Sequence, residues 1–293
     1  MALASAERAA PPRPAVESVR PRRARWSSRT IAFGTAGFAV FFGAVEVVGR
    51  LSGLSEDTLP RAGTILVRMA QLAVDPEFLT AAAITVQSAV IGIVIAILLA
   101  VPAGILLGSS RRAFAATNAL VELLRPIPAV AVIPPALLIF GTGMTMKLFL
   151  VIYAAFWILL YNTIYGVHDV DPVTIDSARS YGLSPQQVLT RVTLPSALPS
   201  IYTGLRVAAT AALLVAIGVE LIGGGVDGIG RWLADEKESK NADAKIQEAV
   251  TRRSDVFAGA FLTGVIGLAV NALLDLGERK GLRWSVRVRG AQS

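Results

Sequence analysis

The stretch DSARSYGLSPQQVLTRVTLP, residues 176–195, is a polar segment between two long apolar ones. Just before it, Asp171 and Pro172 supply an N-cap residue and a proline suited to the first turn of a helix. Gly182 follows at the distance of a short helix, where a glycine can adopt the left-handed conformation that ends it. The pattern predicts a helix from Pro172 to about Tyr181.

A second start signal follows at once. Ser184 is suited to be an N-cap, Pro185 to be the first helical residue, and Gln187 to close a capping box with Ser184. The stretch ends in Leu194-Pro195, where the next apolar segment begins. We therefore predict two short helices joined by a bend, which is more order than a simple solvated connection requires.

The composition around this stretch indicates an integral membrane protein. The chain has 293 residues, of which 54% are hydrophobic, and a mean hydropathy of +0.59. It contains no Cys and one His, so the sequence excludes disulfides and thiolate metal sites and predicts no metal centre. The net charge of +7 gathers at the termini, which favours contact with anionic lipid headgroups over nucleic-acid binding.

Charge-poor windows predict an all-α chain that crosses the membrane six times, since about 20 residues span about 30 Å of hydrocarbon. The first apolar run is longer than the core of a typical signal peptide and has no clear cleavage site, so we treat it as a retained span. The expected spans are 31–48, 81–107, 126–142, 148–167, 201–222 and 256–274, within a membrane domain of residues 30–278.

The distribution of Lys and Arg predicts the orientation of these spans. The two tails (1–29, rich in Arg, Pro and Ser and expected to be disordered, and 279–293), the 108–116 turn and the 168–200 loop hold 16 basic residues. The opposite side holds 10, among them Lys147 and six in the charged 223–255 loop. The positive-inside rule then places both termini and the 168–200 loop in the cytoplasm.

Small side chains recur every four residues in the second span. A ladder of this kind lets two helix backbones approach closely, and we expect it to be a helix-packing face. Its members are Ser88, Gly92, Ala96, Ala100, Gly104 and Gly108.

The third span contains four prolines, Pro126, Pro128, Pro134 and Pro135, which should kink or break it. Arg125 precedes them and is expected to reach the cytoplasmic interface rather than to bind a substrate.

Several isolated features carry no assignment from the sequence alone. Glu46 and Glu220 fall in the outer parts of their spans, where a functional role, a position at the interface and an interhelical hydrogen bond all remain open. His168 ends the fourth span, where its charge would complement the helix dipole. The GGGVDG segment, 223–228, follows a helix rather than a strand, so we expect a flexible loop and no dinucleotide site.

The sequence contains no catalytic signature. P-loop, HExxH, kinase and nucleophile-elbow patterns are all missing, so we predict neither a catalytic residue nor a cofactor-binding residue in this chain.

The stretch at 176–195 resembles the cytoplasmic loop of the permease subunits of bacterial ATP-binding cassette (ABC) importers. That loop carries Glu-Ala-Ala, a Gly four residues after the last Ala, an aliphatic residue ten further on, and then x-Leu-Pro. Every spacing agrees here, with Asp in place of Glu and Ser in place of Ala. The matching residues are Asp176, Ser177, Ala178, Gly182, Val192, Leu194 and Pro195.

The resemblance covers about 60–285 and is greatest to the branch that imports nitrate, taurine, alkanesulfonates and similar small solutes. It implies a type I importer permease in a bacterial cell membrane, with the loop as coupling helices. It also implies a homodimer, a cytoplasmic ATPase dimer that holds ATP and Mg, and an extracytoplasmic solute-binding protein.

Two other classes of membrane protein remain as alternatives. A secondary transporter coupled to protons or sodium usually has carboxylates or His near the middle of the membrane, whereas Glu46 and Glu220 lie toward the ends of their spans. A membrane-embedded enzyme would need a cluster of titratable groups, which the sequence does not suggest.

Overall fold

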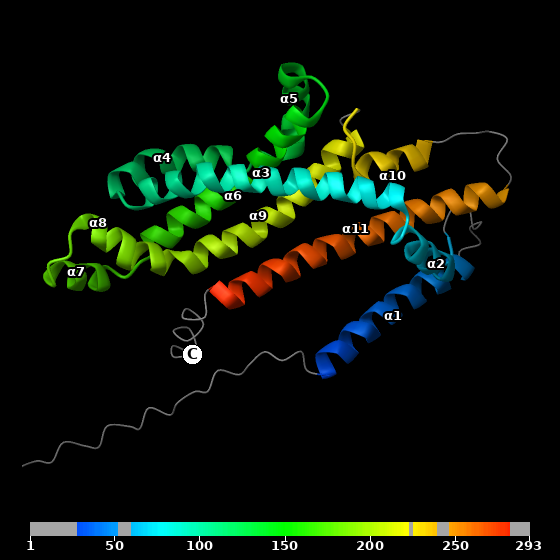
Figure 1. Ribbon diagram of the computed structural model, residues 1–293, viewed down its shortest axis with the longest axis horizontal. Coiled ribbons are helices and arrows are strands. Elements are labelled where there is room, and N and C mark those ends of the chain that lie inside the picture. The colour runs from blue at the N-terminus through cyan, green and yellow to red at the C-terminus, as the bar shows by residue number, and fades with distance from the viewer. Residues whose placement is uncertain (1–27, 52–59, 223–224, 239–245, 282–293) are drawn as a thin grey trace, which may run out of the picture.

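The computed structural model describes residues 28–51, 60–222, 225–238 and 246–281, and every regular element in these ranges is helical (Figure 1). The all-α fold predicted from the sequence is confirmed. In chain order the elements are α1 (Ser28–Leu51), α2 (Ala62–Leu72), α3 (Pro76–Gly108), α4 (Arg111–Leu124), the 3₁₀ turn η1 (Ala129–Val132), α5 (Ile133–Phe140), α6 (Met144–His168), α7 (Pro172–Ser180), α8 (Pro185–Val188), the π-helical turn η2 (Leu189–Thr193), α9 (Leu194–Ile222), α10 (Ile229–Glu238) and α11 (Ile246–Gly281).

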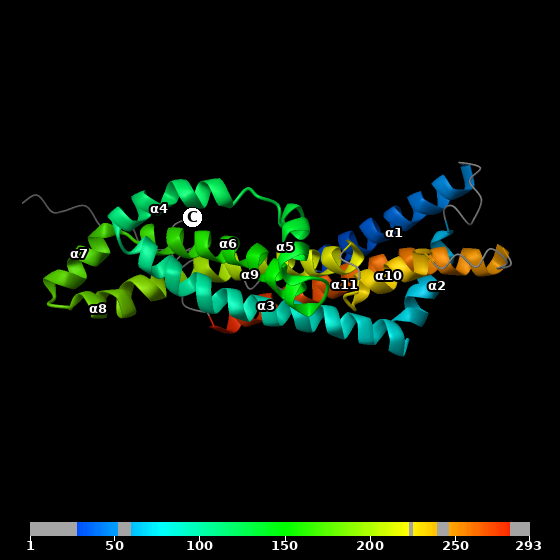
Figure 2. The ribbon, with the colours of Figure 1, turned by 90° about the horizontal axis from the view of Figure 1, so that it is seen from above.

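Three long helices form the centre of the bundle. α6 packs against both α3 and α9, and α3 and α9 also pack against each other (Figures 1 and 2). Leu159 and Ala155 of α6 are fully buried between these neighbours, in a cluster that also contains Ala96 of α3 and Ala208 of α9. The remaining helices are arranged around this three-helix core.

The face of α3 that meets α6 carries the ladder of small side chains. All six members are buried. A Cβ added to Gly92 would lie 2.4 Å from Val151 Cγ1, and one added to Gly104 would lie 2.6 Å from Thr163 Cβ, so only glycine fits at both positions. In α9, Gly204 gives the same close approach, because a Cβ there would lie 2.5 Å from Asn162 Cβ.

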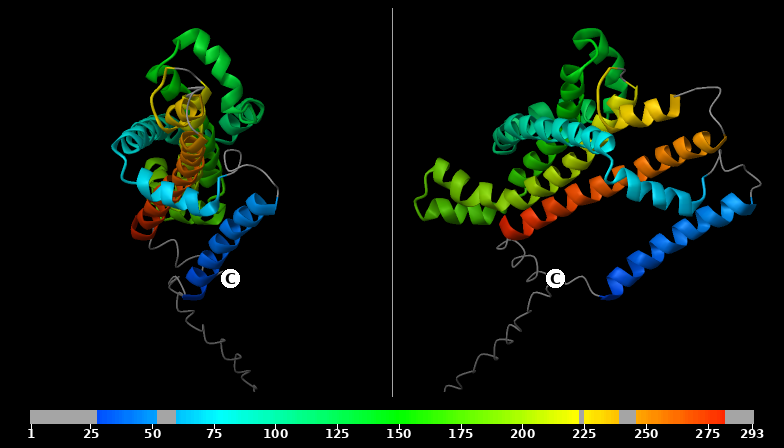
Figure 3. Two further views of the ribbon diagram at one scale, coloured as in Figure 1. Left: turned by 90° about the vertical axis from the view of Figure 1, so that its right-hand side faces the viewer. Right: turned by 45° about the vertical axis from the view of Figure 1, so that its right-hand side comes forward.

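The two ends of the bundle differ. At one end α7 and α8 extend beyond the core (Figure 1). At the other end lie α2, α10 and the start of α11 (Figure 3). There aromatic rings join α10 to α3 and α11 to α1: Phe78 meets Trp232 edge-on at 5.1 Å between ring centroids, and Phe42 meets Phe261 at 5.3 Å. There Arg68 of α2 also pairs with Asp255 of α11.

In the described ranges, five helices are long and apolar enough to cross a membrane, and a sixth span results if one bent pair is counted as a unit. Most of the helices extend beyond the ends of the predicted spans, because they continue past the apolar windows. The predicted boundaries of the two tails, at residues 29 and 279, fall within α1 and α11. The predicted spans 31–48, 81–107, 148–167, 201–222 and 256–274 lie within α1, α3, α6, α9 and α11, respectively.

The break that the prolines predicted in the third span is present. α4 and the η1–α5 segment form a pair bent by 80°, so the candidate span begins at Arg112 rather than at residue 126, and α5 projects away from the core (Figure 1). Pro126 and Pro128 lie in the break, where they need not donate hydrogen bonds, and Pro134 falls in the first turn of α5, where proline is tolerated.

The short helices α2 and α10 lie in segments predicted as loops. Each buries a narrow apolar face, with Ile65 and Leu72 in α2 and Trp232 and Leu233 in α10. α2 has only 11 residues, and α10 has 10 with several charges on its outer face, so neither provides an apolar window of about 20 residues. A search for apolar windows therefore misses both.

Gly92→Leu should lower the midpoint of thermal unfolding in detergent. The Leu Cβ alone would overlap with Val151, and overpacking of this kind typically costs about 1–3 kcal/mol. Val94→Leu is the matched control, because Val94 of α3 is 50% exposed, and it should leave the midpoint nearly unchanged. Equal shifts in the two variants would contradict close packing at Gly92.

Candidate functional site

The α7 helix begins with the predicted cap. Asp171 Oδ1 accepts a hydrogen bond from the backbone N–H of Val173 at 2.9 Å, and Pro172 occupies the first turn. None of the residues of α7 is buried. Asp176 and Arg179 form an exposed ion pair at 3.4 Å, of the kind that contributes little to stability. The helix is therefore held by its ends and leaves its side chains available to a partner.

Gly182 ends α7 in the predicted left-handed conformation, with φ of +81°. The Gly182 N–H donates to Arg179 O at 2.9 Å and the Leu183 N–H donates to Ala178 O at 3.3 Å. These two bonds form a complete Schellman motif, which fixes the direction in which the chain leaves the helix. A Cβ at Gly182 would meet no atom within 4 Å, so only the backbone angle restricts this position to glycine.

The second helix starts at the predicted capping box. The Ser184 N–H donates to Gln187 Oε1 at 2.9 Å, and the Gln187 N–H donates to Ser184 Oγ at 3.4 Å. Thus both start signals and the stop between them are confirmed.

This second helix is not the separate short element that we predicted. α8 continues through the π-helical turn η2 into α9, and Pro185–Ile222 forms one run of 38 residues. The Leu194 N–H donates to Leu189 O, five residues back. Pro195 follows in the first turn of α9, and because it has no N–H it leaves no donor unpaired there. The Leu-Pro pair therefore continues the helix.

A groove of about 630 Å³ lies between α7 and α8 and the ends of α3 and α6. Ile175 and Val188 contribute apolar side chains, and Asp176 and Arg179 contribute charges. His168, in the last turn of α6 as predicted, also lines the groove and stacks on Phe114 with ring centroids 4.8 Å apart. The groove therefore separates α7 from the ends of the core helices α3 and α6.

The seven residues of the predicted coupling motif do not form one patch. Asp176, Ser177 and Gly182 are exposed on α7 and at its end, whereas Val192, Leu194 and Pro195 are half-buried farther along, in η2 and α9. Ala178 is half-buried on α7.

Two exposed apolar side chains at this end were not predicted. Tyr181 is 87% exposed and Val173 is 69% exposed, which makes them candidates for contact with a partner. The position of Tyr181 directly before the bend glycine is the signal that could have identified it.

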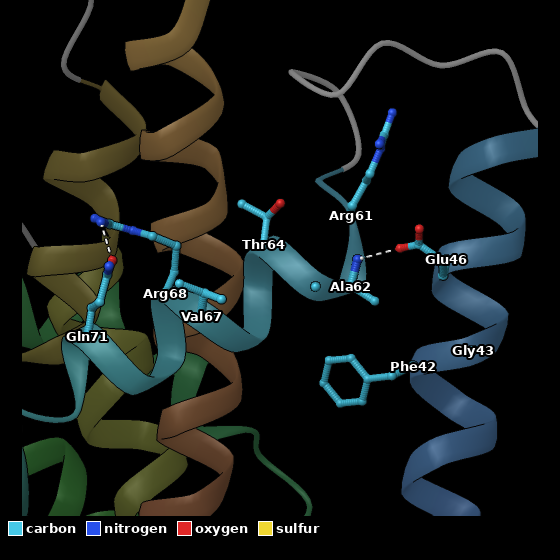
Figure 4. A pocket seen from close by; sticks show the side chains of 10 residues that line it. Phe42, Gly43, Glu46, Arg61, Ala62, Thr64, Val67, Arg68 and Gln71 are labelled. Carbon is cyan, nitrogen blue, oxygen red and sulfur yellow. Dashed lines mark hydrogen bonds between the residues drawn. The ribbon is translucent and has the colours of Figure 1, made fainter.

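The other singled-out residues lie elsewhere. Glu46 pairs with Arg50 at 2.8 Å and accepts from the Ala62 N–H at 3.0 Å, across an open pocket of about 810 Å³ between α1 and α2 (Figure 4). Exposed Arg125 lies over the Tyr161 ring, 3.9 Å from its centroid. These contacts hold helices together. Among the described residues, no group of three or more His, Asp or Glu side chains could hold a metal ion.

Lys147 was placed in an external loop by the charge count, and this placement is wrong. It lies in the first turn of α6, its side chain is fully buried, and it pairs with Glu220 of α9 at 2.5 Å. The carboxylate that the sequence left unassigned thus belongs to a buried interhelical ion pair.

Comparison with known protein families assigns the chain to a family. Residues 92–280 match the model of the binding-protein-dependent transport system inner membrane component. The chain belongs to this family. The match contains the core helices α6 and α9 and the whole α7–α8 segment, and the resemblance to ABC importer permeases is confirmed.

Related permeases resemble the chain over most of their length. The candidate aliphatic sulfonates transport permease SsuC of Bacillus subtilis is 29% identical over 84% of this chain and 85% of its own. The taurine transport system permease protein TauC of Escherichia coli is 31% identical over 70% of this chain and 78% of its own. The nitrate import permease protein NrtB of Leptolyngbya laminosa is 29% identical over 66% of this chain and 64% of its own.

Ser184→Ala should loosen the start of α8. The substitution removes the side-chain oxygen that accepts from Gln187 N–H, and loss of an N-cap typically costs about 1 kcal/mol. Amide hydrogen exchange at residues 186–189 should become several-fold faster. Ser184→Thr keeps the hydroxyl and should exchange nearly as slowly as the parent; equally fast exchange in both variants would contradict the capping role.

Proposed function

We propose that this chain is the permease subunit of an ATP-driven importer for a small anionic or zwitterionic solute of the sulfonate, taurine, nitrate or bicarbonate type. Membership of the binding-protein-dependent family supports the importer role. The names of the related permeases, which include bicarbonate transport as well as sulfonate, taurine and nitrate transport, support the solute class. An extracytoplasmic solute-binding protein would deliver the solute.

The observation that carries the proposal is the α7–α8 segment. It projects from one end of the core, with most of the α7 side chains exposed and with an end and a start fixed by backbone hydrogen bonds. A separate ATPase subunit, which would bind ATP and Mg, would contact α7 and the bend at Gly182.

The continuity of α8 with α9 provides the means of transmission. A displacement of α8 reaches α9 through unbroken helix, and α9 packs on α6 along much of its length. A rigid element of this kind can convert ATP-driven closure of the ATPase subunits into a rotation of the core helices. Two copies of the chain would enclose the pathway, which would open alternately to each side.

The orientation follows from the same proposal. The end that carries α7 and α8 would face the cytoplasm of a bacterial cell together with both termini, and the end that carries α2 and α10 would face outward, toward the binding protein. The basic residues of the tails favour this orientation.

Cysteine labelling tests the orientation. In this Cys-free chain, Asp235→Cys on α10 should react with an impermeant thiol reagent on intact cells, and Gln186→Cys on α8 should react only after the cells are opened. Both positions are exposed, so burial cannot explain a difference. The reverse labelling pattern would show that the orientation is wrong.

Gly182→Val tests the coupling role. Val strongly disfavours positive φ, at a cost of about 1–3 kcal/mol, so the chain should leave α7 in another direction. We expect normal insertion into the membrane, at least tenfold slower uptake of labelled taurine, ethanesulfonate, nitrate or bicarbonate, and weaker co-purification of the ATPase. Asp176→Lys should weaken co-purification without altering the bend.

Gly182→Asn is the matched control, because Asn tolerates the left-handed conformation, and it should keep most of the uptake. Wild-type uptake by Gly182→Val at equal expression would contradict the coupling role. A secondary transporter would give a different result, because its uptake would continue after the ATPase is removed and would collapse with the ion gradient.

A further inference from the structure

Glu220 lies in the last turn of α9, far along that helix from its junction with α8, and is only 2% exposed. Its carboxylate pairs with Lys147 Nζ of α6 at 2.5 Å and lies 2.9 Å from Thr85 Oγ1 of α3. One side chain therefore connects all three helices of the core.

The same group also holds the start of α10. The Gly230 N–H donates to Glu220 Oε2 at 2.9 Å, and the Ile229 N–H donates to Thr85 Oγ1 at 2.9 Å. Lys147 Nζ reaches the backbone carbonyl of Asp227 at 3.4 Å. Side chains from α3, α6 and α9 thus satisfy backbone groups of the turn that begins α10. We call Thr85, Lys147 and Glu220 the α10 anchor.

Glycines make this contact possible. A Cβ at Gly228 would lie 2.1 Å from Glu220 Cδ, and a Cβ at Gly230 would lie 2.3 Å from Ile217 O. The sequence predicted a flexible loop for 223–228, but its described part, 225–228, leads directly into this anchored turn. In this turn, Gly228 and Gly230 have no side chains, so the backbone can lie directly against the Glu220 carboxylate.

An amphipathic helix extends from the anchored turn. Ile229, Trp232 and Leu233 are buried against α3 and α11, and Arg231 and Asp235 are ion-paired on the outer side. A groove of about 510 Å³ separates this outer side from the start of α3. The position of this surface relative to the core is fixed by the α10 anchor.

The stability of the fold alone is a weak explanation for the buried ion pair between Lys147 and Glu220. Two buried charges lose their hydration, and a well-packed apolar pair often stabilises a protein as much or more. Ionisable side chains within membrane spans are rare for the same reason, and those present commonly serve function. The contacts of Glu220 with Gly230 N–H and of Lys147 with Asp227 O, which an apolar pair could not supply, give these charges a geometric role.

We propose that Thr85, Lys147 and Glu220 are positioning residues that make α10 move with α3, α6 and α9 during transport. The proposal rests on the proposed importer function, in which α10 faces the solute-binding protein. A movement of α8 and α9 would then reach the outer surface through Glu220, because this side chain of α9 accepts a hydrogen bond from the first turn of α10.

The test compares Thr85→Val with Thr85→Ser in the full complex with its ATPase. Val has nearly the shape of Thr but cannot accept from Ile229 N–H, whereas Ser keeps the hydroxyl. In Thr85→Val we expect hydrogen exchange at 229–233 to become at least tenfold faster. Uptake per assembled complex, measured with the panel of labelled solutes, should fall at least tenfold, with the ATPase still co-purifying. Thr85→Ser should resemble the parent in both measurements.

Glu220→Leu combined with Lys147→Met provides a second variant, which removes both charges together with the acceptor for Gly230 N–H and avoids an unpaired buried ion. It should show the same loss of uptake per complex. Normal uptake per complex despite faster exchange would overturn the proposal, since the anchor would then be structural only. Unchanged exchange in Thr85→Val would also overturn it. If the parent complex shows no ATP-dependent uptake, the importer function itself fails, and the exchange measurement still reports on the anchor.

Discussion

The close approach of α3 and α9 to α6 is the constraint on which the rest of the fold depends. Within a membrane the hydrophobic effect does not drive helices together, so association relies on van der Waals contact and a few hydrogen bonds. Glycines at 92, 104 and 204 bring backbone against side chains of α6 at distances that a Cβ would prevent. The three helices consequently form one body, and every element with a proposed function is attached to an end of it.

The two ends are attached by different physical means. At the α7–α8 end, the chain relies on its own backbone, through a Schellman motif, a capping box and a helix that continues into α9. At the α10 end, it relies on side chains of the core, which accept hydrogen bonds from a glycine-containing turn. In the proposed importer, the first arrangement would act as a rigid element that a partner moves, and the second would make the α10 surface move with the core.

What the sequence could predict depended on the range of the interactions. Caps, the left-handed glycine and the small-residue ladder are set by neighbours within one or two turns, and the structure has them where the pattern placed them. Lys147 and Glu220 lie in different spans, so no local pattern could pair them, and a charge count assigned Lys147 to the wrong environment. The helices α2 and α10 were missed because their burial depends on distant partners such as Phe78 and Phe42.

The charges of the spans also bear on where a solute would be selected. Among the described residues of the spans, Lys147 is neutralised by Glu220, Arg206 lies against Asp275 and Glu278, and Glu46 pairs with Arg50. Each of these cations already has a carboxylate partner, so binding an anionic solute at one of them would require breaking an ion pair. In the proposed importer, these residues would therefore offer an anionic solute few strong contacts. Under the proposed function, selection would then rest mainly with the solute-binding protein that delivers the solute.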